Sequence, residues 1–419
     1  MTTDPRLAAL RHQALDAAAA GRLADADRLW RQLLGQDPDQ PDALHFFAQQ
    51  AMRQNDMAMA AELLRRAAPR APGDVLLQLN LALASRLTGD DNGEDAALQA
   101  ALAADPACFP ALLARADLLE RRGLVRQAAR ISKDALAITP PDDRLSPSLA
   151  QMADNARRRV AVNADLFADF LRERINSAHL SSPRAKEALA IASGKTRAYV
   201  HQPTMLHFPA LPPISFYDRE LFPWLAELEA ATDTVQQELA GVLERDAKGF
   251  APYVAHREGV PLNQWAALNN SPKWNAWFLW KNGEPQAQHQ ALCPQTTQLL
   301  TRMPMADVPG AAPAAFFSVL EPGAHIPPHT GVTNTRLIVH LPLVVPKDCR
   351  FRVGNDTRTV ERGNAWVFDD SIEHEAWNDS AQTRIILIFD IWNPLLSDSE
   401  KALVQALVAG MSEYYGTDA

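Results

Sequence analysis

The sequence predicts a multidomain α + β protein, in which an all-α repeat solenoid precedes a β-rich domain of barrel or sandwich type with flanking helices. Within the first 140 residues, proline, glycine or asparagine, and alanine each recur at intervals of 34 residues. Between residues 314 and 391, short apolar or alternating runs are separated by clusters of turn-forming residues. A proline-rich stretch at residues 202–213 lies between the two patterns and marks a domain boundary, because proline interrupts regular helix.

Composition excludes several classes of protein. The chain has 419 residues and a formal net charge of −9, which argues against nucleic acid as a partner because phosphate binding needs a basic surface. Its three cysteines lie far apart and predict no disulfide framework. No apolar run approaches the length of a membrane span, and the first residues lack the pattern of a signal peptide. We therefore expect a cytoplasmic protein.

The 34-residue period is carried by three series of residues. They are Pro38, Pro72, Pro106 and Pro140; Gly21, Asn55, Gly89 and Gly123; and Ala14, Ala48, Ala82 and Ala116. The pattern resembles the tetratricopeptide repeat, in which the two antiparallel helices of each unit touch at small residues. We expect four such units in residues 1–140. Their stacked surface either seats a peptide or partner protein, or serves as a spacer or dimerisation arm.

A fourth series, Ala26, Ala60 and Ala128, keeps the same period, but the third unit departs from it and has Glu94 at that position. Residues 89–94 are expected to lengthen the turn of this unit and delay its second helix. Residues 141–202 continue the helical pattern and are expected to cap the repeats and connect them to the next domain. Within them, Ser182 before Pro183 predicts a helix start and Gly194 predicts its end.

Residues 203–396 form the predicted β-rich domain. Its pattern favours an amphipathic helix at residues 222–243, and a C-terminal helix follows within residues 397–419. The predicted strands are short and evenly spaced, which is typical of barrels and sandwiches. They cover residues 314–320, 336–343, 350–353, 358–360, 365–368 and 384–391.

Histidines cluster among these strands. They are His325, His329, His340 and His374. His329 and His374 fall where strands give way to loops, which is where ligand-holding side chains converge. Two imidazoles with open positions suit iron(II), whose usual oxygenase site adds one carboxylate. That carboxylate commonly follows the first histidine by two residues, on the same strand face, and here the position is Gly331. We interpret His325 as structural, although it is the nearest rival ligand.

Arg384 is the predicted partner of a carboxylate-bearing co-substrate, because a guanidinium inside an apolar barrel needs an anion. Ser318 would add a hydroxyl group. If residues 378–380 form a three-residue hairpin loop, His374 lies opposite Arg384. A four-residue loop would place Glu375 there instead.

Several motifs agree in order and spacing with one known family. They are His329-Thr330-Gly331, Asn334, Arg336, His340, the segment from Phe368 to Glu375, Arg384, and the segment from Asp390 to Pro394. Together they resemble the aspartyl/asparaginyl β-hydroxylases, over residues 209–394. The resemblance implies an iron(II)- and 2-oxoglutarate-dependent dioxygenase on a double-stranded β-helix, of the jelly-roll or cupin type, that also consumes O2.

The resemblance also implies roles for individual residues. His329 and His374 would bind iron(II). Arg384 and Ser318 would hold the distal carboxylate of 2-oxoglutarate, and His340 would lie near its other end. The glycine two residues after the first histidine is shared by the family, in which water is thought to replace the usual carboxylate.

The roles of several further residues are open between alternatives. By the resemblance, Trp280 lines the co-substrate pocket, and Arg336 faces either co-substrate or substrate. Animal members carry arginine where this chain has Ile338, which changes the inner carboxylate contact or the choice of substrate. From the residues alone, His340 is equally a buried hydrogen-bonded imidazole. Asp369 and Asp370 either cap the loop or fix the tautomer of an imidazole, and one of them supplying the missing carboxylate is less favoured than water.

Three functions follow from these patterns. The leading hypothesis is hydroxylation of an aspartyl or asparaginyl residue in a peptide or protein that the solenoid helps to seat. The second is the same chemistry on a small metabolite or a lipid. The third is a non-catalytic binding protein built on the repeats.

Overall fold

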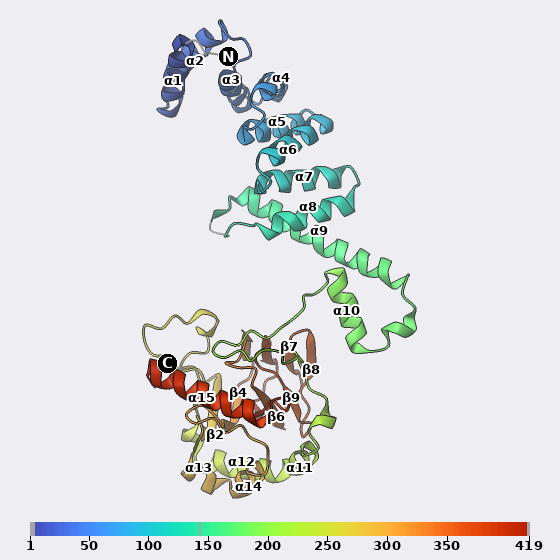
Figure 1. Ribbon diagram of the computed structural model, residues 1–419, viewed down its shortest axis with the longest axis vertical. Helices are drawn as coiled ribbons and strands as arrows, with labels where there is room; N and C mark the ends of the chain where they lie inside the picture. The colour runs from blue at the N-terminus through green and yellow to red at the C-terminus, as the bar shows by residue number, and fades with distance from the viewer. Residues whose placement is uncertain (1–4, 142–143, 417–419) are drawn as a thin grey trace. The chain divides into compact units, whose positions relative to one another are not determined.

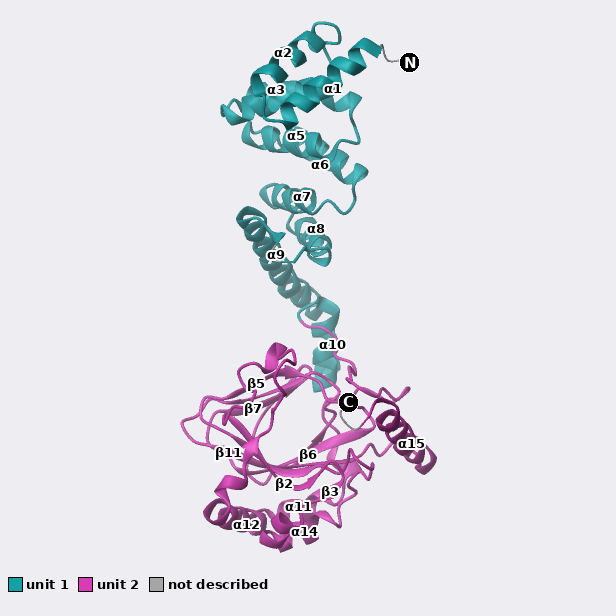
Figure 2. Ribbon diagram, turned by 90° about the vertical axis from the view of Figure 1, so that its left-hand side faces the viewer, with its two compact units in different colours: residues 1–195 teal, residues 196–419 magenta. Residues whose placement is uncertain are grey.

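The computed structural model describes residues 5–141 and 144–416 and divides into two compact units, residues 1–195 and 196–419 (Figures 1 and 2). The first is helical, and the second is built on antiparallel β-sheets. This confirms the predicted order of a helical repeat array and a β-rich domain. The double-stranded β-helix remains a prediction.

Unit 1 begins with four helix pairs. Their bounds are α1 Pro5–Ala19, α2 Leu23–Leu34, α3 Pro41–Arg53, α4 Met57–Ala67, α5 Val75–Leu87, α6 Asp91–Ala104, α7 Phe109–Arg121 and α8 Val125–Ala137. The residue between the two helices of each pair has a positive φ, which glycine and asparagine adopt at least cost: Gly21, Asn55, Gly89 and Gly123. The alanines of the period are buried where the helices touch. The four predicted repeats are therefore confirmed as helix pairs.

The predicted delay in the third unit is wrong. Helix α6 begins at Asp91, the same distance after its turn as the other second helices. Asp90 caps it by accepting a hydrogen bond from the Gly93 backbone N–H at 2.9 Å, which stabilises the first turn despite the glycine. Glu94 is buried at the alanine position and forms an ion pair with Arg121. A paired charge thus replaces the small residue without changing the backbone.

The connecting segment is helical as predicted. Helix α9 spans Pro147–Arg172 and helix α10 spans Pro183–Ser193, with a short 3₁₀ turn between them at Ser177–Leu180. Another 3₁₀ turn, Ala68–Arg70, follows α4. The Ser182 side chain caps α10 by accepting from the Ala185 N–H at 3.1 Å. Gly194 ends it in the left-handed conformation. Both predicted boundaries are confirmed.

Unit 2 contains two antiparallel sheets. The seven-stranded sheet has the order β1-β2-β4-β11-β6-β9 with β3 beside β2, and the four-stranded sheet has the order β5-β10-β7-β8. The strands are β1 Ala251–Pro252, β2 Trp274–Lys281, β3 Glu284–Pro285, β4 Ala315–Leu320, β5 His325–His329, β6 Arg336–Val344, β7 Cys349–Val353, β8 Asp356–Thr359, β9 Trp366–Phe368, β10 His374–Asn378 and β11 Arg384–Trp392. Five of them, β1, β2, β3, β5 and β10, lie outside the predicted strands.

Four helices of unit 2 cover one face of the larger sheet. They are α11 Leu225–Ala230, α12 Thr232–Arg245, α13 Ala287–Leu292 and α14 Pro294–Leu300, with 3₁₀ turns at Arg219–Leu221, Ala247–Gly249 and Asn263–Trp265. Figure 2 shows β5 and β7 on one side of β2 and β6, and α11, α12 and α14 on the other. The predicted helix at residues 222–243 is thus two helices, because the chain turns at Ala231.

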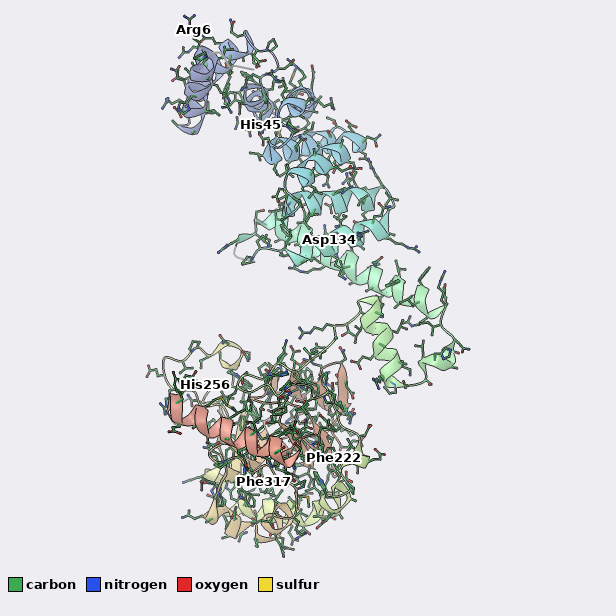
Figure 3. The ribbon with its side chains drawn as sticks, viewed as in Figure 1. Arg6, His45, Asp134, Phe222, His256 and Phe317 are labelled. Carbon is green, nitrogen blue, oxygen red and sulfur yellow. The ribbon has the colours of Figure 1, made fainter. Side chains whose placement is uncertain are left out.

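The two faces of the larger sheet bury two separate cores. Along β11, Ile385, Leu387 and Phe389 pack toward the helices, in the core that also holds Phe222 and Phe317 (Figure 3). Ile386 and Ile388 pack on the opposite face, between the two sheets. Because side chains alternate along a strand, Arg384 belongs to this second, inner face.

The predicted hairpin between residues 374 and 384 is wrong. Strand β10 pairs with β5 and β7, whereas β11 pairs with β4 and β6, so Arg384 lies opposite Leu320 and not opposite His374 or Glu375. The loop crosses from one sheet to the other. The Asn378 side-chain amide holds this crossing by donating to the carbonyls of Leu320 and Gln382 at 2.9 and 2.8 Å.

The last helix of the described residues is α15, Asp398–Tyr415. Its cap is Ser397, whose side chain accepts from the Glu400 N–H while Glu400 accepts from the Ser397 backbone. This confirms the predicted C-terminal helix over its described part. Among the described residues, no helix combines the length and apolarity needed to cross a bilayer.

Candidate active site

Two imidazoles meet at the rim of the four-stranded sheet. His329 ends β5, His374 begins β10, and the two residues are direct partners in the ladder. Their ring centroids lie 4.0 Å apart. The structure therefore brings together the two predicted metal ligands, close enough to share one ion. Their role as ligands remains a prediction.

Hydrogen bonds orient both rings in the same way. The Nδ1 atom of His329 lies 2.8 Å from the Pro327 carbonyl, and that of His374 lies 3.0 Å from the Ile372 carbonyl. A carbonyl only accepts, so each Nδ1 carries the proton and each Nε2 keeps its lone pair. Burial lowers the pKa of both histidines, well below the ordinary value for His374. Neutral imidazoles held this way are the form that binds metal.

The carboxylate of Asp370 occupies the space beside Gly331. A Cβ atom added to Gly331 would lie 2.0 Å from Asp370 Oδ2. Burial, and then the charge of Asp369, raise the pKa of Asp370 to about 7. Within residues 5–141 and 144–416, no group of three or more His, Cys, Asp or Glu side chains has a metal-binding arrangement. Asp370 thus stands beside the histidine pair without joining it.

Replacing Gly331 with alanine is expected to push the Asp370 carboxylate away. Overpacking of this kind costs about 1–3 kcal/mol of unfolding free energy, and it should also lower turnover. Thermal unfolding of Gly331→Ala and a turnover assay test this. Gly410→Ala is the control, because no atom lies within 4 Å of a Cβ at that helical position. A G331A variant as stable and active as the parent would contradict the close contact.

Arg384 is an unpaired buried cation. Its side chain is 1% exposed, and its Nε and Nη1 atoms have no hydrogen-bond partner. Burial lowers its pKa to about 10. An isolated charge in such a place is costly unless an anion joins it. Ser318 lies on the same sheet face, accepts from Trp274 Nε1 at 3.0 Å, and keeps its O–H proton to donate. These donors fit a carboxylate.

His340 faces the inner core and is close enough to both Arg384 and His374 for their charges to interact. It is buried on β6, and its Nδ1 atom has no hydrogen-bond partner. Burial, and then the charge of Arg384, lower its pKa well below the ordinary value, while His340 in turn helps to lower the pKa of His374. No protein group thus holds Nδ1, and the co-substrate contact and the structural imidazole both stay predictions for His340.

Trp280 does not line this space, which corrects the prediction. The ladder between β2 and β4 is irregular between Phe278 and Trp280, so Trp280 packs in the core beneath the helices. Phe278 and Trp274 face the inner core instead. Trp274 and Trp265 approach the His329 ring, with centroids at 6.5 and 4.9 Å. Strand alternation from Trp274 is the signal that identifies the inward-facing aromatics.

Arg336 already has a protein partner. It forms an ion pair with Asp390, whose Oδ1 also accepts from the Ala314 N–H at 2.9 Å. Its charge is thus balanced within the protein, unlike that of Arg384. The structure gives no support to the predicted contact between Arg336 and a co-substrate.

In the comparison with known proteins, residues 229–394 match a protein family. They match the model of the family described as aspartyl/asparaginyl beta-hydroxylase. Unit 2 carries an aspartyl/asparaginyl β-hydroxylase domain. The resemblance inferred from the motifs is confirmed by this match.

Relatives of the β-hydroxylase domain differ in their named activities. Human aspartyl/asparaginyl beta-hydroxylase is 35% identical over 192 residues, which cover 44% of this chain and 24% of the human protein. The ornithine lipid ester-linked acyl 2-hydroxylase of Rhizobium tropici is 33% identical over 189 residues, covering 44% of this chain and 62% of that protein. The chain therefore spans less than two thirds of each of these relatives.

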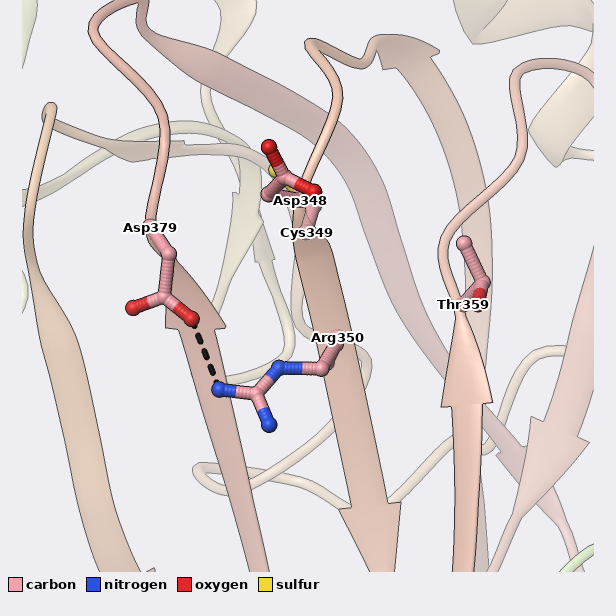
Figure 4. Close-up of a pocket in the computed structure, with 5 residues that line it drawn as sticks. All are labelled: Asp348, Cys349, Arg350, Thr359 and Asp379. Atoms are coloured by element: carbon pink, nitrogen blue, oxygen red, sulfur yellow. Dashed lines mark hydrogen bonds and ion pairs between the residues drawn. The ribbon is translucent and has the colours of Figure 1, made fainter.

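The other histidine of strand β5, His325, is not part of the site of the β-hydroxylase domain. Its side chain is 43% exposed, contacts Glu375 Oε2 at 3.0 Å and stacks on Trp377. This supports its structural interpretation. A separate hollow of about 440 Å³ is lined by Asp348, Cys349, Arg350, Thr359 and Asp379 (Figure 4). None of these is a predicted site residue, and Arg350 is paired with Asp379 at 2.7 Å.

A buried cluster that no sequence pattern indicates supports the loop before His374. His201 Nε2 lies 3.1 Å from the Leu211 carbonyl, and its Nδ1 lies 2.9 Å from Ser371 Oγ and 3.2 Å from Asp369 Oδ2. Ser371 gives its own proton to Asp369 Oδ1 at 2.6 Å. Both nitrogens of His201 therefore donate, which requires the charged imidazolium. Asp369 is engaged here and is not available to the histidine pair.

This cluster predicts a pH-dependent stability. Although burial opposes it, the hydrogen bond and charge of Asp369 raise the pKa of His201 above its ordinary value. The stabilisation is therefore complete below about pH 6.5 and lost as pH rises through the folded-state pKa. His201→Asn should cost about 1–3 kcal/mol at pH 6 and less at pH 9. Chemical unfolding at both pH values tests this, with exposed His207→Asn as control. An equal cost at both values would show that His201 is neutral.

Proposed function

We propose that this protein is an iron(II)- and 2-oxoglutarate-dependent dioxygenase that hydroxylates an aspartyl or asparaginyl residue of a peptide or protein. The observation that carries the proposal is the unpaired, buried Arg384 on the inner face that also holds His340, near the histidine pair. An unpaired buried charge destabilises an apolar core, so core packing does not account for Arg384. A site for a carboxylate-bearing co-substrate next to a metal accounts for it.

Each residue of the candidate site then has a defined role in binding or orientation. His329 and His374 would hold the iron through Nε2, with their orientation fixed by backbone carbonyls. Arg384 and Ser318 would hold the distal carboxylate of 2-oxoglutarate. The iron would supply activation of O2, coupled to oxidation of 2-oxoglutarate to succinate and CO2, for insertion of one oxygen atom into a C–H bond. Asp370, whose carboxylate lies against Gly331, would accept a hydrogen bond from water at the iron site.

Aromatic side chains would keep the reaction dry. Phe351 and Phe368 lie 6.0 and 5.4 Å from the His374 ring, and Trp265 lies 4.9 Å from His329. A low-dielectric wall strengthens the contacts that polar groups make with the co-substrate. It also limits side reactions with water.

The substrate class is tested by mass. The iron-loaded protein would be given 2-oxoglutarate with peptides that contain aspartate or asparagine, and in parallel with acyl lipids. A gain of one oxygen atom on a peptide supports the proposal. A gain on the lipid alone would favour the second hypothesis, which the Rhizobium tropici relative motivates. No turnover of 2-oxoglutarate at all would leave the binding-protein hypothesis.

We propose that the solenoid seats the polypeptide substrate. Helix α5 exposes an apolar face made of Leu76, Leu83 and Leu87, which are 56, 45 and 57% exposed. Replacing Leu83 and Leu87 with serine is expected to raise KM for long peptides severalfold and to leave short peptides unaffected, because a short peptide would engage unit 2 alone. Steady-state kinetics on the two lengths check this. Equal KM values for parent and variant would instead favour a spacer or dimerisation arm.

A further inference from the structure

Most of the buried side-chain polar atoms that lack a hydrogen bond in the described part of unit 2 belong to residues of the inner face. Buried side-chain atoms without a hydrogen bond there include Arg384 Nε and Nη1, His340 Nδ1 and Trp366 Nε1. The remaining one, Asp369 Oδ2, lies 3.2 Å from His201 and so has a charged neighbour. Leaving a buried donor unpaired costs free energy, so native structures rarely do it without a functional reason. Arg384 and His340 belong to the proposed co-substrate site, whereas Trp366 is not among the residues assigned to it.

Trp366 is the direct neighbour of His340 across the sheet. The two residues are partners in the ladder between β6 and β9, and their ring centroids lie 5.4 Å apart. The Trp366 ring also lies 6.0 Å from Phe351 of the opposite sheet, so it faces the inner core. The next inward residue of β9 is Phe368, whose ring lies 5.4 Å from His374. Trp366 therefore sits one pleat further from the histidine pair, at the level of His340.

Apart from Trp366 and His340 themselves, no residue of these two strands supplies a donor there. The partner of Phe368 on β6 is Ile338, which has no polar side-chain atom. Arg336, at the start of β6, is paired with Asp390. The indole N–H can only donate, so its natural partner is a group that only accepts, such as a carboxylate. In a dry site a hydrogen bond of this kind is stronger than in water.

We propose that Trp366 Nε1 donates a hydrogen bond to a carboxylate oxygen of the bound 2-oxo acid, beside His340 and opposite the end held by Arg384. The inference rests on the proposed function and adds to it a residue that fixes the position of the co-substrate. The bond forms without covalent change. Its removal therefore weakens co-substrate binding and leaves the metal site intact.

The test is Trp366→Phe, which keeps an aromatic ring and removes the N–H. Binding of 2-oxoglutarate would be measured by calorimetry on protein loaded with zinc(II), which does not turn over. The expected result is a Kd about tenfold higher, equivalent to about 1.4 kcal/mol, with unchanged zinc affinity. Trp30→Phe is the matched control, because Trp30 Nε1 is also buried and unpaired but lies in unit 1. An unchanged Kd for W366F would overturn the inference.

A second measurement uses the wild-type protein and does not depend on whether W366F folds. In ¹⁵N-labelled wild-type protein loaded with zinc(II), the Trp366 indole resonance should shift downfield when 2-oxoglutarate is added, while that of Trp30 stays in place. Selective labelling, or the spectrum of W366F where that variant folds, assigns the signal. If 2-oxoglutarate binds and the Trp366 signal does not move, the inference fails and the proposed function stands. If the wild-type protein does not bind 2-oxoglutarate, both fail.

Discussion

Replacing Arg384 with methionine is expected to abolish turnover of 2-oxoglutarate and, at the same time, to make the protein more stable. The guanidinium is buried without an anion, so its removal relieves a desolvation cost of about 1–4 kcal/mol. The same change removes the donor that would hold the distal carboxylate, and KM for 2-oxoglutarate should rise by roughly 100-fold or more. Activity and stability are thus expected to move in opposite directions, which is the signature of a residue kept for function.

Two measurements decide this prediction. Urea unfolding gives the free energy of R384M relative to the wild type, and succinate formation gives its turnover. Arg384→Lys is the matched control, because it keeps a positive charge but loses the planar fork that recognises a carboxylate. It should bind 2-oxoglutarate weakly and show little gain in stability. An R384M variant that is less stable, with ordinary KM for 2-oxoglutarate, would mean that Arg384 has a structural role.

The sequence predicts well the features that depend on local chemistry. Gly21 and Asn55 predict turns because they tolerate positive φ, and Ser182 with Gly194 predicts the two ends of a helix. His329 and His374 can be paired from the sequence because their motifs agree with the family in order and spacing. In each case the evidence lies within a few residues of the feature it predicts.

Apart from the predicted delay of α6, which misjudges local residues, the errors and omissions have a common physical origin. The sequence on the two sides of Asn378 has the pattern of a hairpin, but the chain passes from one sheet to the other there. This crossing depends on pairing with strands far away in the sequence. Trp280 turns away from the site because of a single irregularity in β2. The cluster of His201 joins segments 170 residues apart, and no local pattern reveals it. The contact of Asp370 with Gly331 is of the same kind.

His374→Ala is expected to remove turnover of 2-oxoglutarate altogether. In the proposed site, His329 and His374 are the two described residues that would hold iron(II), so losing one would leave a single protein ligand. Because outer contacts alone are commonly worth 10–100-fold in metal affinity, the loss of a direct ligand should lower iron affinity by roughly 100-fold or more. With so few ligands, even the wild-type protein should release iron readily to a chelator. Iron content after dialysis against a chelator, followed by succinate formation on adding iron back, measures both effects.

His325→Ala is the matched control for His374→Ala. The two residues lie on paired strands of the same sheet, but the side chain of His325 is exposed and contacts Glu375. Its replacement should leave iron binding and turnover unchanged. The H325A variant thereby separates loss of a ligand from a general disturbance of the β5–β10 ladder. If H374A bound iron and formed succinate as the wild type does, the metal would have to lie elsewhere. The unpaired charge of Arg384 would then need a different explanation.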